Sequence, residues 1–527
     1  MVKKVNLVAE VSQIELQVAV IGAAGGVGIA VSNTTESSGV TLTSTGSCNV
    51  QYKVGDGLWL NLQKDQGIDL AVNLAVTSLY LRRSTHDMGA CSANIVIDSQ
   101  PFASIASQQL GKFASNFSGD IGIPGMQGFG VGIAPSLPAG IAEMFGCKNP
   151  ASDNYGSYQY TDGSIMVYVP AFFYKVGADI NGIAINRIDV KSYGTYADVA
   201  SATAAGYALH RAFYNNGTIR PGVFVDKYQC SNNGGIASSL KNGNPLSSNS
   251  AHNPFSGLTG APANIYGGAI AAAKTRGASF FCASIFIHKM LALLSLAHAQ
   301  ASTGTAFCAW YDPAGVTNFP KGCNNNALRD SNDATLLYVS DGYSNCGKTG
   351  SSNALARTTH NGQNCGVADL NGNMWEIAPG LTSDGVNYYI LKTAADMTAA
   401  TGGNTLSTDL WGAAGLAALY TSIGATYESL TASGTNKIFG AATQVLSPAT
   451  TGDAWAMAGA GVPLATGVGG SNLFGSDYMY DARPNELCVL SGATWGYGGS
   501  AGVWALYLDT VRGYSNAAVG FRSASYL

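Results

Sequence analysis

The side chains that could perform chemistry are scattered along this sequence. His288 and His298 stand ten residues apart, which on a helix places them roughly 80° apart and nearly three turns apart. One metal ion cannot bridge that separation, and no H-E-x-x-H motif is present, so we expect both histidines to be structural. Carboxylate pairs such as Asp477 and Asp481 are common in turns. A G-x-S-x-G spacing occurs at residues 498–502, but no interpretable Ser-His-Asp arrangement accompanies it, and no catalytic residue is assigned.

A glycine-rich run at residues 18–28, VAVIGAAGGVG, imitates the first turn of a dinucleotide-binding fold. Such a turn binds a pyrophosphate only where a helix follows it. Residues 29–39 are instead rich in β-branched and turn-forming residues. We therefore expect a strand connection here and no bound nucleotide.

The ten cysteines are widely spaced and form no C-x-x-C pair, which argues against a zinc ribbon and against a disulfide framework. Buried free thiols are the expected state. A bridge among the four cysteines of one loop-rich region stays an alternative. The cysteines are Cys48, Cys91, Cys147, Cys230, Cys282, Cys308, Cys323, Cys346, Cys365 and Cys488, the loop-rich group being Cys308, Cys323, Cys346 and Cys365.

Composition narrows the class of protein. The 527 residues include 67 glycines and 26 tyrosines, only 11% are charged, and the net charge is −4. Disordered chains carry more charge and fewer aromatic residues than this one, and nucleic-acid-binding proteins carry a basic patch, so this sequence fits neither class. No secretory signal and no apolar run of 18 residues is present, so we expect synthesis in the host cytoplasm without export and no membrane span. The profile favours a glycine-rich, β-containing protein that packs or oligomerises.

Residues 1–112 read as a small all-β sandwich for attachment or oligomerisation, with a hairpin signal at Gly55, Asp56 and Gly57. Residues 113–180 read as a connector and the first strands of a second domain, including one strong strand at 163–175. Beyond them we expect a helix at 198–214, a strand at 223–228, loops at 232–275 and a core helix at 279–300. Residues 303–365 are expected to form loops whose Asp and Asn oxygens could bind Ca²⁺.

The most informative stretch is the tail, residues 491–527, SGATWGYGGSAGVWALYLDTVRGYSNAAVGFRSASYL. Tyr and Trp between Gly, Ser and Asn suit a contact surface, because aromatic rings give large contact area at low entropic cost. An ordinary glycine-rich β-edge is the alternative.

Two motifs give this region a family resemblance. The tail carries GATW at 492–495, AGVWAL at 501–506 and GFRS at 520–523, and residues 366–376 read GVADLNGNMWE. In this order they resemble the variable proteins of diversity-generating retroelements, which have a C-type lectin fold related to formylglycine-generating enzymes. The resemblance covers roughly residues 120–527. It implies an α+β lectin-like domain at 181–527, with an insertion at about 395–470 and a variable ligand-binding tail at 491–522.

The resemblance divides the tail into two sets of positions. In such proteins, adenine-directed mutagenesis changes Asn codons, and the residues reached include Tyr, Asp, Ser, Gly, Thr and Ala. The expected variable, ligand-binding positions are Thr494, Gly496, Tyr497, Ser500, Tyr507, Asp509, Thr510, Tyr514, Asn516, Ala517 and Ala518. The expected constant scaffold comprises Trp495, Ala501, Gly502, Val503, Leu506, Leu508, Arg512, Gly513, Gly520, Phe521 and Arg522, together with Asp369, Gly372, Asn373, Trp375 and Glu376 of the upstream motif.

The resemblance implies a function in binding and not in catalysis. The related oxidases carry a cysteine pair before the closing motif, whereas only Cys488 stands there in this chain. We expect a phage tail or virion receptor-binding protein, a homotrimer, whose tail binds a bacterial surface protein or glycan and whose N-terminal domain contacts other virion proteins. An invariant structural virion protein is the alternative, and a formylglycine-type oxidoreductase is a weaker one. We expect no cofactor, with Ca²⁺ left open.

Overall fold

A computed structural model places two compact units, Met1–Ser115 and Asn116–Leu527. In the first unit it describes nine strands between residues 4 and 101. In the second it describes residues 120–178, 180–259, 265–301, 320–399, 416–423, 430, 434–439, 444–466, 474 and 476–526. The Gly-rich run at 21–28, Cys48, Cys308 and the whole segment at 400–415 lie outside the described residues.

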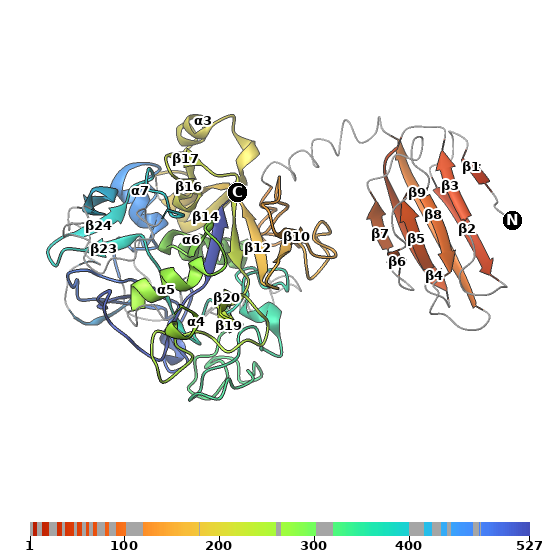
Figure 1. Ribbon diagram of the computed structural model, residues 1–527. Helices are drawn as coiled ribbons and strands as arrows, with labels where there is room; N and C mark the ends of the chain where they lie inside the picture. Colours follow the sequence, from red (N-terminus) through yellow and green to blue (C-terminus); the bar gives the residue numbers. More distant parts are fainter. Residues whose placement is uncertain are drawn as a thin grey trace. The chain divides into compact units, whose positions relative to one another are not determined.

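The described elements of the first unit are all strands, arranged in two sheets (Figure 1). The five-stranded sheet has the order β1-β3-β8-β5-β6, and the four-stranded sheet has the order β2-β9-β4-β7. Strands β5 and β6 form the antiparallel pair that the Gly-Asp-Gly signal predicts. The strands are β1 (Lys4–Leu7), β2 (Gln13–Val20), β3 (Ile29–Asn33), β4 (Ser37–Gly46), β5 (Val50–Val54), β6 (Leu60–Leu62), β7 (Gly67–Leu70), β8 (Leu79–Arg83) and β9 (Cys91–Pro101).

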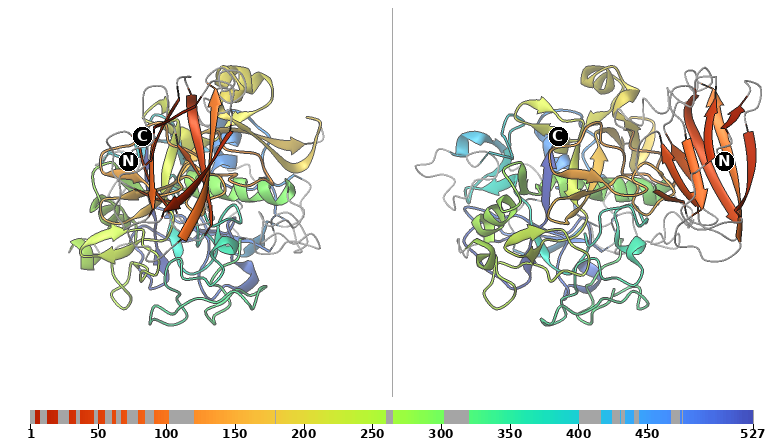
Figure 2. Two further views of the ribbon diagram at one scale, coloured as in Figure 1. Left: turned by 90° about the vertical axis from the view of Figure 1, so that its right-hand side faces the viewer. Right: turned by 45° about the vertical axis from the view of Figure 1, so that its right-hand side comes forward.

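The second unit is mixed, with mostly sheet and few helices. Its first large sheet contains β10 (Ile141–Glu143), β11 (Ser157–Tyr160), β12 (Ile165–Pro170), β18 (Gly222–Asp226), β31 (Ser523–Tyr526) and β21 (Phe280–Cys282), in that spatial order. The tail strand β31 therefore lies between two strands that come more than 240 residues earlier (Figures 1 and 2).

A second six-stranded sheet carries the rest of the tail. Its spatial order is β26 (Asn436–Ile438), β27 (Tyr478–Asp481), β29 (Leu506–Leu508), β28 (Leu490–Ser491), β22 (Trp375–Ile377) and β30 (Val519–Gly520). Three of the six strands belong to the tail, and β22 belongs to the upstream motif. The two motifs that carry the resemblance are therefore neighbours in one sheet.

Smaller sheets complete the unit. They are β14 (Ile183–Ser192) with β13 (Phe172–Ala178) and β15 (Ala208–Leu209), β16 (Tyr214–Asn215) with β17 (Thr218–Ile219), β19 (Ser231–Asn233) with β20 (Ile236–Ser238), and β23 (Leu381–Ser383) with β24 (Tyr388–Leu391) and β25 (Tyr420–Ile423). The helices are α3 (Val199–Ala204), α4 (Ser256–Thr259), α5 (Ile265–Lys274), α6 (Ile285–Ala301) and α7 (Gly452–Gly459), with short 3-10 turns η1 (Tyr193–Thr195), η2 (Arg211–Phe213), η3 (Leu355–Thr358), η4 (Leu416–Leu419) and η6 (Gly498–Ser500).

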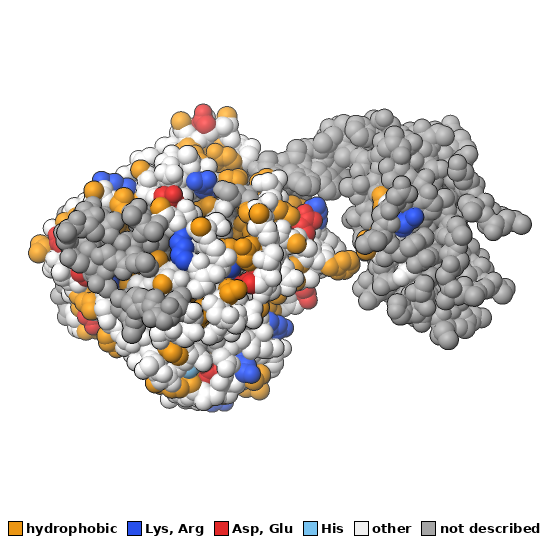
Figure 3. All heavy atoms as spheres, viewed as in Figure 1, with side chains coloured by type: hydrophobic (Ala, Val, Ile, Leu, Met, Phe, Trp, Pro, Cys, Tyr) orange, Lys and Arg blue, Asp and Glu red, His pale blue; other side chains and the backbone are white. Residues whose placement is uncertain are grey.

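Helix α6 is the centre of the core. Its sequence is apolar around most of its circumference, and every residue from 285 to 299 is buried, as expected for a helix enclosed on all sides. No helix among the described residues is long and apolar enough to cross a membrane. On the face of the second unit seen in Figure 3, charged side chains are scattered singly among polar and hydrophobic ones.

Several predicted elements differ in the structure. The helix expected at 198–214 ends at Ala204, because Gly206 adopts a positive φ of 81° and turns the chain. The strand expected at 163–175 is two strands, β12 and β13, that belong to different sheets. The core helix begins at Ile285, after the short strand β21, and not at 279. The region at 232–275, expected to be loops, contains α5.

The expected insertion at about 395–470 also contributes to the core where it is described. Met457 of α7 is fully buried, and the Trp455 indole nitrogen donates a hydrogen bond to the Leu209 carbonyl at 3.0 Å. Strand β26 extends the sheet that carries the tail. This part of the segment therefore belongs to the core of the unit.

Candidate binding site

The upstream motif holds the tail through a buried ion pair. The Arg522 guanidinium donates to both carboxylate oxygens of Glu376, at 2.6 and 2.7 Å. Its remaining N–H groups reach the carbonyls of Asp226, Ala368 and Asp369 at 3.0–3.2 Å. Both side chains are buried, and bidentate geometry is what makes such a pair tolerable without water. Glu376 of the upstream motif thus holds Arg522 of the tail.

The Gly-Asn step of the motif makes the backbone contacts. Gly372 has a φ of 72° and donates its N–H to the Gly492 carbonyl at 2.8 Å. The Asn373 side chain accepts from the Gly347 N–H and donates to the Gly347 carbonyl, at 2.8 and 3.0 Å. Asp369 accepts the Gly350 N–H. Strand β22 then pairs with β28 on one side and with β30 on the other.

A lysine from the core helix fixes the middle of the tail. The Lys289 ammonium donates to the carbonyls of Val503 and Ala505 at 2.8 and 3.2 Å, and to the Ser491 hydroxyl at 3.0 Å. Burial lowers the pKa of Lys289 to about 7, and the nearby Asp477 carboxylate opposes that shift. Asp477 in turn accepts the Trp504 N–H at 2.8 Å. The AGVWAL block is therefore held by two buried polar side chains, Lys289 and Asp477.

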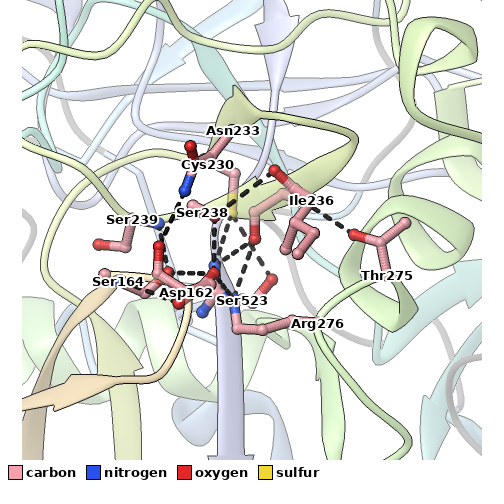
Figure 4. A network of polar contacts seen from close by, with 12 residues as sticks. Asp162, Ser164, Cys230, Asn233, Ile236, Ser238, Ser239, Thr275, Arg276 and Ser523 are labelled. Carbon is pink, nitrogen blue, oxygen red and sulfur yellow. Dashed lines mark hydrogen bonds and ion pairs between the residues drawn. The ribbon is translucent and has the colours of Figure 1, made fainter.

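A third network anchors β31 (Figure 4). The buried Arg276 guanidinium donates to both oxygens of Asp226, at 2.5 and 3.0 Å, and lies 3.4 Å from Asp162. Asp226 also accepts the Ser523 N–H at 2.9 Å. Asp162 receives the Ser238 hydroxyl at 2.6 Å. The network thus joins the last described strand to elements more than 200 residues away.

Most positions expected to vary meet in one hollow of about 410 Å³. Eight of the eleven line it: Thr494, Tyr497, Tyr507, Asp509, Thr510, Tyr514, Asn516 and Ala518. The three others, Gly496, Ser500 and Ala517, do not line it. The remaining lining residues are Trp375, Leu490, Val511 and Val519.

Trp375 lies among the aromatic rings of this hollow. Its side chain is only 4% exposed, and its ring centroid lies 5.3 Å from that of Tyr497 and 5.6 Å from that of Tyr507. Tyr478 stacks on Tyr497 at 5.4 Å. Tyr497 and Tyr514 are 37% and 46% exposed, so each has a supported base and an accessible ring. Fixed rings of this kind give contact area at little entropic cost.

The positions expected to be constant are mostly enclosed. Nine of the eleven tail positions are buried, the exceptions being Trp495 and Gly513. Trp495 is half-buried and its ring lies 6.2 and 6.3 Å from those of His252 and Tyr343. Gly513 is exposed. Among the expected variable positions, Thr494 and Thr510 are buried, although both border the hollow.

Residues that the sequence left without a role complete the site. Trp375 was expected only as a core residue, and Leu490, Val511 and Val519 carried no signal. The D-x-x-G-N-x-W-E motif could have located Trp375, because the pairing of β22 with β30 brings it beside the tail. Nothing in the local sequence marks Val511.

The other chemistry-bearing residues have structural surroundings. His298 accepts the Gly125 N–H at 3.0 Å and stacks on Phe129, and burial lowers the pKa of His288 well below its usual range. Asp481 accepts the Tyr388 hydroxyl. Burial raises the pKa of Cys488 to about 12, which keeps its thiol protonated. The seven cysteines whose side chains are described are free and buried, Cys323, Cys346 and Cys365 among them. Asp330 accepts N–H bonds from Gly322, Asn332 and Asp333, so its oxygens act as turn acceptors.

No protein-family model matches this chain, and no curated protein matches it. Among solved structures it is similar to three variants of Major Tropism Determinant, all at a TM-score of 0.25. The U1 variant is 10% identical over 70% of this chain and 65% of its own, the I1 variant is 11% identical over 69% and 63%, and the P3c variant is 10% identical over 69% and 63%. This chain thus spans less than two thirds of the length of each.

Proposed function

We propose that this chain is a ligand-binding protein whose tail presents a variable recognition surface on a constant scaffold. One observation carries the proposal. Eight of the eleven tail positions chosen from the sequence as variable line one aromatic hollow, while nine of the eleven tail positions chosen as constant are buried. A diversified binder needs this division, because side chains at an accessible surface can change without loss of the core.

The chemistry of the hollow suits a macromolecular target. Tyr497, Tyr507 and Tyr514 supply aromatic area, and Asp509 and Asn516 supply polar groups at the same rim. Aromatic anchors surrounded by adaptable polar residues are typical of paratopes. We infer a target on a bacterial surface, protein or glycan, with the chain carried on a phage or phage-like particle. The N-terminal unit would then attach the chain to other virion proteins, and a homotrimer would add avidity.

The first test is to sequence the codons for residues 491–527 in many clones from one source and to search the adjoining DNA for a near-copy of that segment. We expect substitutions at the eight positions that line the hollow, while Gly502, Gly520 and Arg522 stay fixed. Substitutions spread evenly over buried and exposed positions would contradict the proposal.

An invariant segment with no adjoining near-copy would favour the second candidate, a structural virion protein with the same fold and a fixed tail. The two candidates make the same demands on the scaffold, so stability measurements do not separate them. The presence or absence of sequence variation at the rim of the hollow separates the two candidates.

A further inference from the structure

A compact group of three metal-binding side chains lies next to the tail and outside the hollow. One ring nitrogen of His252, one Asp341 carboxylate oxygen and Cys346 Sγ all lie within 4.8 Å of one another. His252 and Cys346 are buried, and the Asp341 side chain is fully enclosed. The three groups come from two loops that are 89 residues apart in sequence, so the fold itself brings them together.

The surroundings of the His252 ring determine which nitrogen carries the proton. Its Nδ1 lies 2.7 Å from the Ala517 carbonyl oxygen, which can only accept a hydrogen bond, so Nδ1 must be the donor. Its Nε2 lies 2.5 Å from Asp341 Oδ2, also an acceptor. In a neutral ring, Nε2 would direct its lone pair at the carboxylate. A cation held by both atoms would remove that repulsion.

The loop that bears the other two ligands is closed on itself. The Asp341 N–H donates to the Cys346 carbonyl and the Cys346 N–H donates to the Tyr343 carbonyl, each at 3.0 Å. Asp341 Oδ1 accepts the Tyr343 N–H at 2.8 Å, which leaves Oδ2 directed at His252. Tyr343 also stacks on the His252 ring at 4.2 Å. The orientation of both carboxylate and imidazole is thus fixed without a metal ion.

We propose that His252, Asp341 and Cys346 bind one Zn²⁺ ion, with Nε2, Oδ2 and the Cys346 thiolate as ligands and a fourth position open. Nitrogen, oxygen and sulfur together suit zinc, whereas the thiolate disfavours Ca²⁺ and Mg²⁺. In zinc sites, the ring nitrogen that does not bind the metal commonly donates a hydrogen bond that fixes the orientation of the imidazole. The Nδ1–H bond of His252 to the Ala517 carbonyl is a contact of this kind. Burial, reinforced by the Asp341 carboxylate, raises the pKa of the Cys346 thiol, and binding Zn²⁺ would displace its proton.

The proposed ion would also act on the recognition surface. Because His252 Nδ1–H holds the carbonyl of Ala517, a zinc ion on Nε2 would tie the 341–346 loop to the outer turn of the tail. Asn516 and Ala518, which flank Ala517, both line the hollow. Zinc would therefore fix the rim of the hollow without occupying it. This inference does not depend on the tail being diversified.

The test uses the full chain, reduced and freed of metal with a chelator, and then loaded with Co²⁺ or Zn²⁺. We expect one ion per chain after gel filtration, a near-ultraviolet thiolate-to-cobalt absorption band, and visible bands with the intensity of a four-coordinate site. Since these readings are made on the unaltered chain, they do not require any variant to fold. A chain that retains no zinc and shows no thiolate band would overturn the proposal.

Matched variants locate the ion. Cys346→Ser should abolish the thiolate band and weaken zinc binding by at least about tenfold, a loss that even outer-shell changes can cause. Cys365→Ser is the control, because Cys365 is a buried free thiol outside the group and its loss should leave both readings unchanged. Equal loss in the two variants, or no loss in Cys346→Ser, would place the metal elsewhere and refute the assignment.

Discussion

Gly502 is the sharpest test of the division between scaffold and surface. A Cβ atom added there would overlap all three carboxyl atoms of Asp477. That carboxylate cannot easily move, because it is fully buried and accepts the Trp504 N–H. Overpacking a core costs about 1–3 kcal/mol, and leaving a buried N–H without its acceptor costs about 1–3 kcal/mol more. Gly502→Ala should therefore lower the free energy of unfolding by about 2–6 kcal/mol.

Gly496→Ala is the matched control. Gly496 belongs to the same tail, is exposed, and a Cβ there would meet only the Thr494 hydroxyl at 4.0 Å. Its cost should stay within about 0.5 kcal/mol. Urea unfolding followed by tryptophan fluorescence measures both variants, since Trp504 and Trp375 report from inside the second unit. Equal midpoints for the two variants would refute the reasoning.

A double variant separates the clash from other effects. Asp477→Ser shortens the side chain that the new methyl group meets, so Gly502→Ala should cost less in that background than in the native chain. The difference is a coupling energy between the two positions. Strictly additive costs would mean that the overlap with Asp477 is not the cause.

Three further predictions concern the same unit, each measured by urea unfolding. Lysine at position 522 cannot make both bonds to Glu376, so Arg522→Lys should lower the free energy of unfolding by about 3–5 kcal/mol, as breaking a buried pair does. Arg187→Lys, at an exposed hydrogen bond to a carbonyl, is the control and should lower it by less than about 0.5 kcal/mol. Similar losses in the two variants would contradict the assignment of Arg522 as an anchor. Trp375→Ala should cost about 3–5 kcal/mol because it empties an enclosed site, while Tyr514→Ala, at 46% exposure, should cost little. Burial lowers the pKa of His360 from 6.5 to about 3, so between these values the unfolded chain binds a proton that the folded chain does not. The free energy of unfolding should therefore fall as the pH falls from about 6.5 to 3, by up to about 1.4 kcal/mol per pH unit at this site, and His360→Asn should lose that part of the slope.

The sequence was most informative where residue type and burial depend on each other directly. In the tail, apolar and more polar residues alternate from Leu506 to Asp509, and burial follows: Leu506 and Leu508 are buried, while Tyr507 and Asp509 are half-buried. The polar side chains that hold the tail could not be predicted from the sequence. A lysine in the middle of an apolar helix gives no sign that Lys289 will meet the carbonyls of residues 503 and 505.

Long-range strand pairing and glycine content account for most of the differences between the predicted and the observed elements. Helix α5 contains the step Gly267-Gly268, which argues against a helix locally, yet its alanines are buried against the core. Here tertiary packing outweighs propensity. Trp375 joins the hollow only because β22 lies between β28 and β30. Pairing between segments more than 100 residues apart leaves no periodic signal in either segment.

Because β31 lies at the end of the described chain, truncated variants lose part of the core. Its four residues lie between β18 and β21, and Arg522, just before it, neutralises Glu376. Both come after every position expected to vary, so a premature stop or a frameshift anywhere in residues 494–518 also removes the strand and the cation that complete the core. Such a product cannot finish folding and is left to proteolysis. If the tail is diversified as proposed, folding itself would select among the copies. Only variants that are read through in frame would fold and present the proposed recognition surface.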